Sequence, residues 1–87
     1  MISGTTRHFW GCFENLPDRV QNIAKDKFGL WKRDPLHPSL HFKELAPGLW
    51  SVRITLRYRA LARKKANRVI WFWIGTHEDY DRLLRSL

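Results

Sequence analysis

His77 and Tyr80 are the residues of this 87-residue chain whose types and spacing best suit acid–base chemistry. They lie three positions apart, just after the apolar run Val69–Ile74, and in a helix this spacing puts both side chains on one face. The first N–H groups of a helix attract anions. A neutral imidazole accepts a proton, and a phenol donates one or stacks on a nucleobase. The pair is therefore a candidate acid–base site beside an anion. The structural alternative is a capping histidine next to a core tyrosine.

The odd-numbered positions of the segment 50–63 include Ser51, Arg53, Thr55, Arg57, Arg59 and Arg63, and the candidate row consists of Arg53, Arg57 and Arg59. The even positions of that segment are apolar: Trp50, Val52, Ile54, Leu56, Tyr58, Ala60 and Ala62. Alternation with a period of two predicts extended strand with one apolar and one cationic face. A row of arginines suits a ligand rich in phosphate, and Lys43 could extend it. The alternative is a strand face made soluble by charge.

The segment 50–63 is either one long strand or a hairpin bent near residues 55–57, where no Gly or Asn marks a turn. If the bend centres on Leu56, Arg53 and Arg59 become cross-strand partners. Two like charges set opposite each other destabilise a sheet unless an anion lies between them. Either topology puts both arginines on the face opposite the core.

No metal or cofactor site is expected from the remaining reactive side chains. His37 and His41 are four positions apart, but Pro38 between them breaks a helical presentation, and no nearby Cys or acid pair completes a site. The single Cys12 excludes a disulfide within the chain. It lacks the basic neighbours of a nucleophilic thiol, so we expect it to be a packing residue.

The charge of the chain narrows the class of partner. Sixteen Lys and Arg against eight Asp and Glu give a net charge of +8. Residues 49–87 carry nine of these bases and only three acids. Such a field attracts nucleic acid or an acidic protein, unless it is simply a solvated surface. No apolar run approaches the roughly 20 residues that span a bilayer, and the N-terminus is unlike a signal peptide, so we expect a cytoplasmic protein without a membrane contact.

The expected elements form a single α+β domain over residues 1–87, in the order β-α-α-β-β-β-α. Helical spacing predicts an αα-hairpin hinged at Leu16–Pro17, with Pro17 as the first residue of the second helix, which ends by Asp34. Val69–Ile74 reads as a central strand covered on both faces. The remaining expectations are a first strand at 5–7, a loop at 34–39, regular structure returning at 40–45, turns at 47–48 and 64–67, and a last helix that begins at Thr76.

Four segments of the chain together resemble the RelE/ParE superfamily of toxins from bacterial type II toxin–antitoxin modules. They are LPDRVQNIAKDKF at 16–28, RDPLHPSLHFKEL at 33–45, WSVRI at 50–54 followed by YRAL at 58–61, and VIWFWIGTHEDYDRLL at 69–84. The resemblance covers nearly the whole chain. It implies two helices packed on one face of a twisted, mostly antiparallel sheet, with a short C-terminal helix.

The resemblance also implies an activity and roles for particular residues. Toxins of the RelE type are similar to ribosome-dependent mRNA endonucleases, in which a 2′-hydroxyl attacks the adjacent phosphate without a metal. Arg59 then matches a transition-state stabiliser on the sheet, while Arg53 and Lys43 match basic positions that contact phosphate. His77 matches the histidine that follows the last strand in YafQ-like and HigB-like members. Tyr80 stands near the C-terminal aromatic that orients the base or assists proton transfer.

Two alternatives stay open beside the ribonuclease. The ParE branch shares the fold and resembles inhibitors of DNA gyrase with no nuclease chemistry, and a degenerate, non-catalytic member is also possible. Arg57 shares the strand parity but matches no catalytic position, so we expect it to contribute only phosphate affinity. In all three cases the resemblance implies a cognate, acidic antitoxin protein as partner; a ribonuclease adds mRNA and the ribosome.

Overall fold

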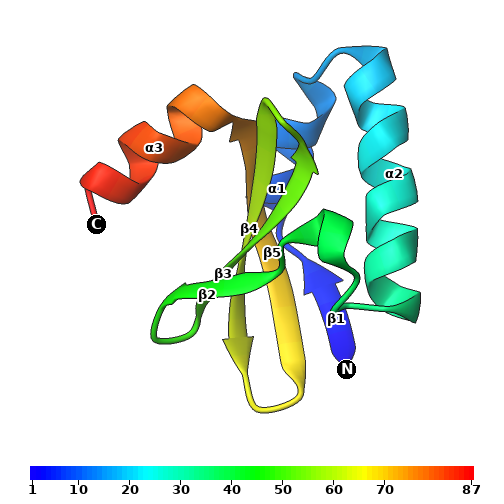
Figure 1. Ribbon diagram of the computed structural model, residues 1–87. Coiled ribbons are helices and arrows are strands. Elements are labelled where there is room, and N and C mark those ends of the chain that lie inside the picture. The colour runs from blue at the N-terminus through cyan, green and yellow to red at the C-terminus, as the bar shows by residue number, and fades with distance from the viewer.

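The computed structural model describes residues 1–87, and its α+β architecture confirms the predicted class. The elements are β1 (Ile2–Thr5), α1 (Arg7–Glu14), α2 (Asp18–Arg33), the short 3-10 helix η1 (Pro38–Leu40), β2 (Lys43–Ala46), β3 (Leu49–Thr55), β4 (Tyr58–Lys65), β5 (Arg68–Thr76) and α3 (His77–Arg85). All five strands form one twisted sheet in the order β1-β5-β4-β3-β2 (Figure 1). The helices α1 and α2 lie on one side of this sheet and α3 on the other (Figure 1).

The N-terminal elements differ from the prediction in their bounds, and the first strand begins earlier. The first strand ends at Thr5, and Thr6, expected within it, instead caps α1 by accepting a hydrogen bond from the N–H of Phe9 at 3.1 Å. This strand pairs in parallel with β5, whereas all other pairings are antiparallel. Pro17 is the N-cap of α2 rather than its first helical residue. Its fixed φ suits either position, so the sequence does not distinguish them.

The connector that precedes the sheet contains a strand that the sequence-based order omits. Residues Lys43–Ala46 pair with β3 at the edge of the sheet, with Lys43 opposite Ser51. Only one edge of β2 is paired, and its burial pattern shows little of the alternation that identifies a half-buried strand. An edge strand of this kind owes its conformation to its neighbour rather than to its own residues.

The segment 50–63 is a hairpin, which settles the choice left open by its alternation. The strands β3 and β4 are joined by a turn at Leu56 and Arg57, and Arg53 lies directly opposite Arg59. The even positions Val52, Ile54 and Ala60 are buried in the main core, as predicted. The arginine pair therefore lies on the opposite face of the sheet.

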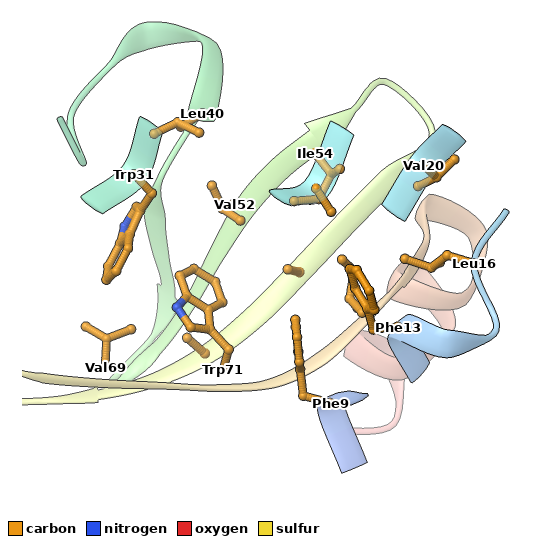
Figure 2. Packing of buried hydrophobic residues seen from close by; sticks show 14 residues of the cluster. Phe9, Phe13, Leu16, Val20, Trp31, Leu40, Val52, Ile54, Val69 and Trp71 are labelled. Carbon is orange, nitrogen blue, oxygen red and sulfur yellow. The ribbon is translucent and has the colours of Figure 1, made fainter. Parts of the chain in front are cut away.

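The main core lies between the sheet and the helices α1 and α2. It contains fourteen buried residues, which Figure 2 draws as sticks. The indole of Trp31 and the ring of Phe28 both meet Trp71 edge-on, at centroid distances of 5.3 Å and 5.1 Å. Edge-to-face aromatic packing of this kind stabilises a core beyond the area that it buries. The half-buried Cys12 packs against this cluster, in line with its predicted packing role.

A second, smaller cluster lies under α3 on the other face. Leu49, Leu61 and Tyr80 are its buried members, and Phe72 and Trp73 pack against it. The strand β5 is thus covered on both faces, as its unbroken apolar run predicts. It also contains a bulge, because Ala62 pairs with Trp71 and Leu61 with Trp73, which leaves Phe72 without a partner. None of the three helices is both long and apolar enough to cross a membrane.

Candidate functional site

A hollow of about 140 Å³ opens on the α3 side of the sheet, between the β3–β4 hairpin, the edge strand β2 and the start of α3. Its lining, which we call the cationic pocket, consists of His41, Lys43, Ser51, Arg53, Arg59, His77 and Tyr80. Five of the six predicted site residues therefore meet in one place. The sixth, Arg57, lies exposed in the hairpin turn and does not line the pocket.

The hairpin brings Arg53 and Arg59 together. They occupy opposed positions of β3 and β4, and neither forms an ion pair with an acidic residue. The nearest side-chain partner of Arg53 is His41, with Nη1 and Nε2 3.3 Å apart. Two guanidinium groups held opposite each other without a counterion raise the energy of the sheet. A bound anion such as a phosphate would remove that cost.

The guanidinium of Arg59 is fixed by its own hairpin. Its Nη1 group donates to the carbonyl oxygens of Thr55, Leu56 and Tyr58, at 2.6, 3.1 and 3.1 Å. Burial, followed by the charge of Arg53, lowers the pKa of Arg59, while Tyr80 and Asp81 act in the opposite direction. An arginine stays protonated under such shifts. Arg59 is therefore a preorganised cation that also holds the turn together.

His77 begins α3, at the place that its spacing predicted. Thr76 caps the helix by accepting from the N–H of Asp79 at 3.1 Å. The N–H of His77 donates to the carbonyl of Arg57 at 2.7 Å, which ties the start of the helix to the hairpin turn. Because these two amides already have partners, the helix start offers an anion fewer donors than the sequence suggested. The positive charge of the pocket comes from its side chains.

The imidazole of His77 is oriented by Asp81, one turn further along α3. The Nδ1 atom of His77 lies 3.1 Å from Oδ2 of Asp81, and both side chains are about half exposed. A carboxylate at Nδ1 favours the tautomer with its proton there, which leaves the lone pair on Nε2. The ring of Tyr80 lies 5.4 Å from the imidazole, centroid to centroid. The predicted pair therefore shares one end of the pocket.

Tyr80 has both of the roles that its spacing left open. Its ring is a buried member of the cluster under α3, yet it also lines the pocket, and no protein group hydrogen-bonds to its hydroxyl. The indole of Trp73 packs beside it and over Gly75, where an added Cβ would come within 2.6 Å of the indole. Gly75 therefore leaves room for the indole that supports Tyr80.

Three residues near the predicted site were missed by the sequence analysis. His41 ends the 3-10 helix η1 in the left-handed conformation, so it enters the pocket through the path of the connector, which its position in the sequence does not reveal. Asp81 stands at i+4 from His77, a spacing that could have been read directly. The buried Ser51 shares the strand parity of Arg53, so the alternation already put it on the arginine face, but a serine there was not singled out as a site residue.

The two histidines that were considered as metal ligands lie apart. His37 bonds to the hydroxyl of Ser39, while His41 belongs to the cationic pocket. No group of three or more His, Cys, Asp and Glu side chains in residues 1–87 could hold a metal ion. The chemistry available in the pocket is thus fixed positive charge combined with proton transfer by imidazole and phenol.

A larger hollow of about 450 Å³ lies on the helical side, where α1, α2 and β1 meet. Half of its lining residues are aromatic, and its only titratable side chains are Lys25 and Lys32. It therefore has no acid–base pair, and size alone does not make it the better candidate.

Comparison with known proteins agrees with the fold described here. A family model for the ParE-like toxin domain matches residues 18–82. A YoeB/ParE toxin from Agrobacterium tumefaciens is 24% identical, with a TM-score of 0.69 over 88% of this chain and 99% of that one. YafQ from E. coli strain BL21(DE3) is 13% identical, with a TM-score of 0.73 over 90% and 94% of the two chains.

A RelB–RelE antitoxin–toxin complex from Methanococcus jannaschii contains a third similar chain. It is 13% identical, with a TM-score of 0.72 over 90% of this chain and 95% of that one. No curated protein sequence matches. At these identities the solved structures show only that the fold is shared. Membership of a family rests on the family model that matches residues 18–82.

Proposed function

This chain belongs to the family of ParE-like toxin domains, and we propose that it is the toxin of a bacterial type II toxin–antitoxin module that cleaves ribosome-bound mRNA without a metal. One observation carries the proposal. An unneutralised pair of arginines faces a histidine and a tyrosine across a single small pocket. Phosphodiester cleavage by an internal hydroxyl needs this combination: positive charge for the phosphate, a base and an acid.

The reaction can be written with the side chains present. The 2′-oxygen of one nucleotide forms a bond to the adjacent phosphorus, and the bond from that phosphorus to the 5′-oxygen of the next nucleotide breaks. The Nε2 atom of His77 accepts the proton of the 2′-hydroxyl, and the phenol of Tyr80 donates a proton to the leaving 5′-oxygen. The products are a 2′,3′-cyclic phosphate and a free 5′-hydroxyl, and the proton on His77 returns to Tyr80 through solvent.

The cations of the pocket have separate tasks in this scheme. Arg59, fixed by three carbonyl groups, stabilises the charge that accumulates on the phosphate oxygens in the transition state. Arg53 and Lys43 bind phosphate in the ground state and align the strand. Asp81 is a positioning residue, since it touches His77 rather than the RNA.

An acidic antitoxin is the partner that we propose for this chain. The similar chain of Methanococcus jannaschii was solved as an antitoxin–toxin complex. The net charge of +8 and the unpaired cations around the pocket favour an acidic chain that covers them. Co-purification from the native host should recover one small acidic protein. Recovery of the free toxin alone, with no such protein encoded beside its gene, would contradict the partner.

A second candidate function is inhibition of DNA gyrase, which the ParE-like description of the matching family model favours. The two functions differ in what happens to mRNA after brief induction in a bacterial host. A ribonuclease should cut transcripts within minutes of induction, before any DNA damage response. Intact messages together with an SOS response would replace the ribonuclease with the gyrase inhibitor. Growth without either effect would indicate a degenerate member.

The cleavage itself is best tested with purified protein and translating ribosomes. We expect cuts in the ribosome-bound message, with 2′,3′-cyclic phosphate on the upstream fragment and a 5′-hydroxyl on the downstream one. The ribosomes are first loaded onto short mRNA fragments, so that no further assembly is needed. Chelation of divalent ions at that point should not lower the rate of the cleavage step. Cleavage products with a 5′-phosphate would exclude the mechanism written above.

A further inference from the structure

Four cations surround the β4–β5 turn, at the opposite end of β4 from the cationic pocket. Arg63, Lys64, Lys65 and Arg68, together with Pro47, Gly48 and Ile70, line a hollow of about 420 Å³, which we call the distal basic pocket. Figure 1 shows this turn at one end of the sheet, while α3 begins at the other. No acidic residue belongs to the lining.

Two of these cations are held in place by aromatic rings. The guanidinium of Arg63 lies over the ring of Phe72, 5.5 Å from its centroid. The Nζ atom of Lys64 lies 5.6 Å from the centroid of Trp50 and donates to the carbonyl of Ala66 at 3.1 Å. Contacts of this kind limit the motion of the side chains and keep their charge. The entropy lost when they bind a ligand is correspondingly smaller.

The cations of the distal basic pocket differ from those of α3 in having no acidic partner. Arg82 on α3 lies 3.0 Å from Asp79 and 3.6 Å from Glu78, whereas none of Arg63, Lys64, Lys65 and Arg68 forms an ion pair. The nearby carboxylate of Glu44 accepts from the N–H of Gly48 at 3.1 Å. This one nearby carboxylate offsets only part of the charge of four cations, so the distal basic pocket keeps a net positive charge, which attracts a polyanion.

We propose that the distal basic pocket binds the phosphate backbone of the RNA several nucleotides away from the bond that is cut. This inference rests on the proposed ribonuclease function. Along β4, Arg59 of the cationic pocket and Lys64 of the distal basic pocket are five residues apart, a distance of about 17 Å at the usual rise of a strand. One nucleotide cannot reach both. Contacts with distant phosphates supply affinity and register and leave the chemistry to the cationic pocket.

A phosphate backbone fits the distal basic pocket better than an acidic protein does. Its lining exposes no aromatic side chain and only one branched apolar residue, the half-buried Ile70. Protein interfaces take most of their binding energy from buried apolar and aromatic anchors. Phosphate contacts need only lysine, arginine and backbone donors. Binding of an acidic protein at this pocket is therefore an outcome that the test must be able to detect.

The test compares two RNAs that differ in length. Both carry 2′-O-methyl groups so that they cannot be cleaved; one has about 2 nucleotides, too few to reach both pockets, and the other about 20. Fluorescence anisotropy gives the affinity of the wild type and of the triple variant Lys64→Ala/Lys65→Ala/Arg68→Ala. We expect the longer RNA to bind at least about 10-fold more weakly to the variant, with a salt dependence shallower by about 2 for three lost contacts to single-stranded RNA. The shorter RNA should bind both proteins equally.

A charge-matched control separates a local contact from the general field. The variant Lys25→Ala/Lys32→Ala/Arg33→Ala removes the same charge from exposed positions of α2. Equal losses in both triple variants, or an equal loss for both RNAs, would overturn the proposal. So would unchanged RNA binding together with weakened binding of a co-purified acidic protein. If the wild type binds neither RNA, both the proposed ribonuclease function and the distal RNA site are wrong. If the wild type cleaves message and the distal triple variant binds both RNAs as the wild type does, only the distal RNA site is wrong.

Discussion

The two faces of the sheet are used differently. The face under α1 and α2 buries fourteen residues in an apolar cluster, whereas the face toward α3 buries three apolar residues and leaves a cationic pocket beside them. Both faces are formed by alternate residues of the same strands. In β3, Val52 and Ile54 point into the main core while Arg53, between them, lines the pocket.

The contrast teaches that alternate residues of one strand can serve different purposes in this fold. Residues of one parity stabilise the core, and residues of the other parity can bind a ligand. Residues of the helical face contribute mainly through burial, and their loss should unfold the protein. Residues of the α3 face carry charge that the fold does not need, and some of it is unfavourable until an anion binds. Arg59 and Tyr80 cross this division, since each also supports the structure around it.

The largest effect is expected from His77→Ala. Loss of the group that takes the 2′-hydroxyl proton should lower the rate of mRNA cleavage by about 10²–10⁴-fold. The melting temperature should change little, because the side chain is about half exposed and its only ion pair lies at the surface. His8→Ala, an exposed histidine on α1, is the matched control. Wild-type cleavage by a folded His77→Ala protein would remove the acid–base role.

Phe9→Ala tests the opposite face. Phe9 is only 1% exposed and packs at the centre of the main cluster, so its truncation should cost about 3–5 kcal/mol of the free energy of unfolding. Urea unfolding measures this loss. At a temperature where the variant stays folded, the cleavage rate per folded molecule should remain close to that of the wild type. A large loss of rate in the folded variant would mean that the two faces are coupled.

Arg59→Ala should affect both properties at once. Cleavage should fall by about 10²–10³-fold, with a smaller change in RNA affinity, because the charge that Arg59 balances appears mainly in the transition state. Three turn carbonyls also lose their donor, which should cost about 1–3 kcal/mol of stability. Single-turnover kinetics and thermal unfolding measure the two effects separately.

A control for the structural part of this effect is available in the same turn. Leu56→Gly loosens the turn at a residue that is 72% exposed and leaves every side chain of the cationic pocket in place. If Leu56→Gly loses as much stability as Arg59→Ala but cleaves at the normal rate, the charge of Arg59 is responsible for the rate. If both lose cleavage equally, Arg59 acts through the turn.

Asp81→Asn should have a smaller effect than loss of His77 itself. Without the carboxylate the imidazole is held less firmly, and misplacement of a catalytic group costs up to about 10²-fold in rate. The change should appear in kcat, with KM little altered. Nitrogen NMR shifts of His77 should reveal a smaller share of the tautomer with its proton on Nδ1. An unchanged tautomer population would show that Asp81 does not orient the ring.

Arg57→Ala should have the smallest effect. Its side chain lies outside the cationic pocket, and its carbonyl, which accepts from His77, survives the substitution. We expect the salt dependence of RNA binding to become shallower by about 0.7 per lost phosphate contact, with cleavage at saturating RNA unchanged. A loss of rate as large as that of Arg59→Ala would extend the chemistry beyond the pocket.

The amino-acid sequence by itself determined the features that depend on near neighbours along the chain. Alternation in 50–63 put Arg53 and Arg59 on the face opposite Val52 and Ile54, and the cap at Thr76 placed His77 at the start of α3. Strand parity and helix capping depend on bonds and steric contacts within a few residues. These features could therefore be derived from residue types and spacing, and the structure confirms them.

Only the tertiary structure decided which distant segments meet. The parallel pairing of β1 with β5 and the meeting of His41 with His77 in the cationic pocket join parts of the chain far apart in sequence. The edge strand β2 pairs with the strand that follows it, but its own residues show no alternation that announces this pairing. These positions follow from packing around the main core, in which the free energy of a pairing depends on every neighbour rather than on local preference.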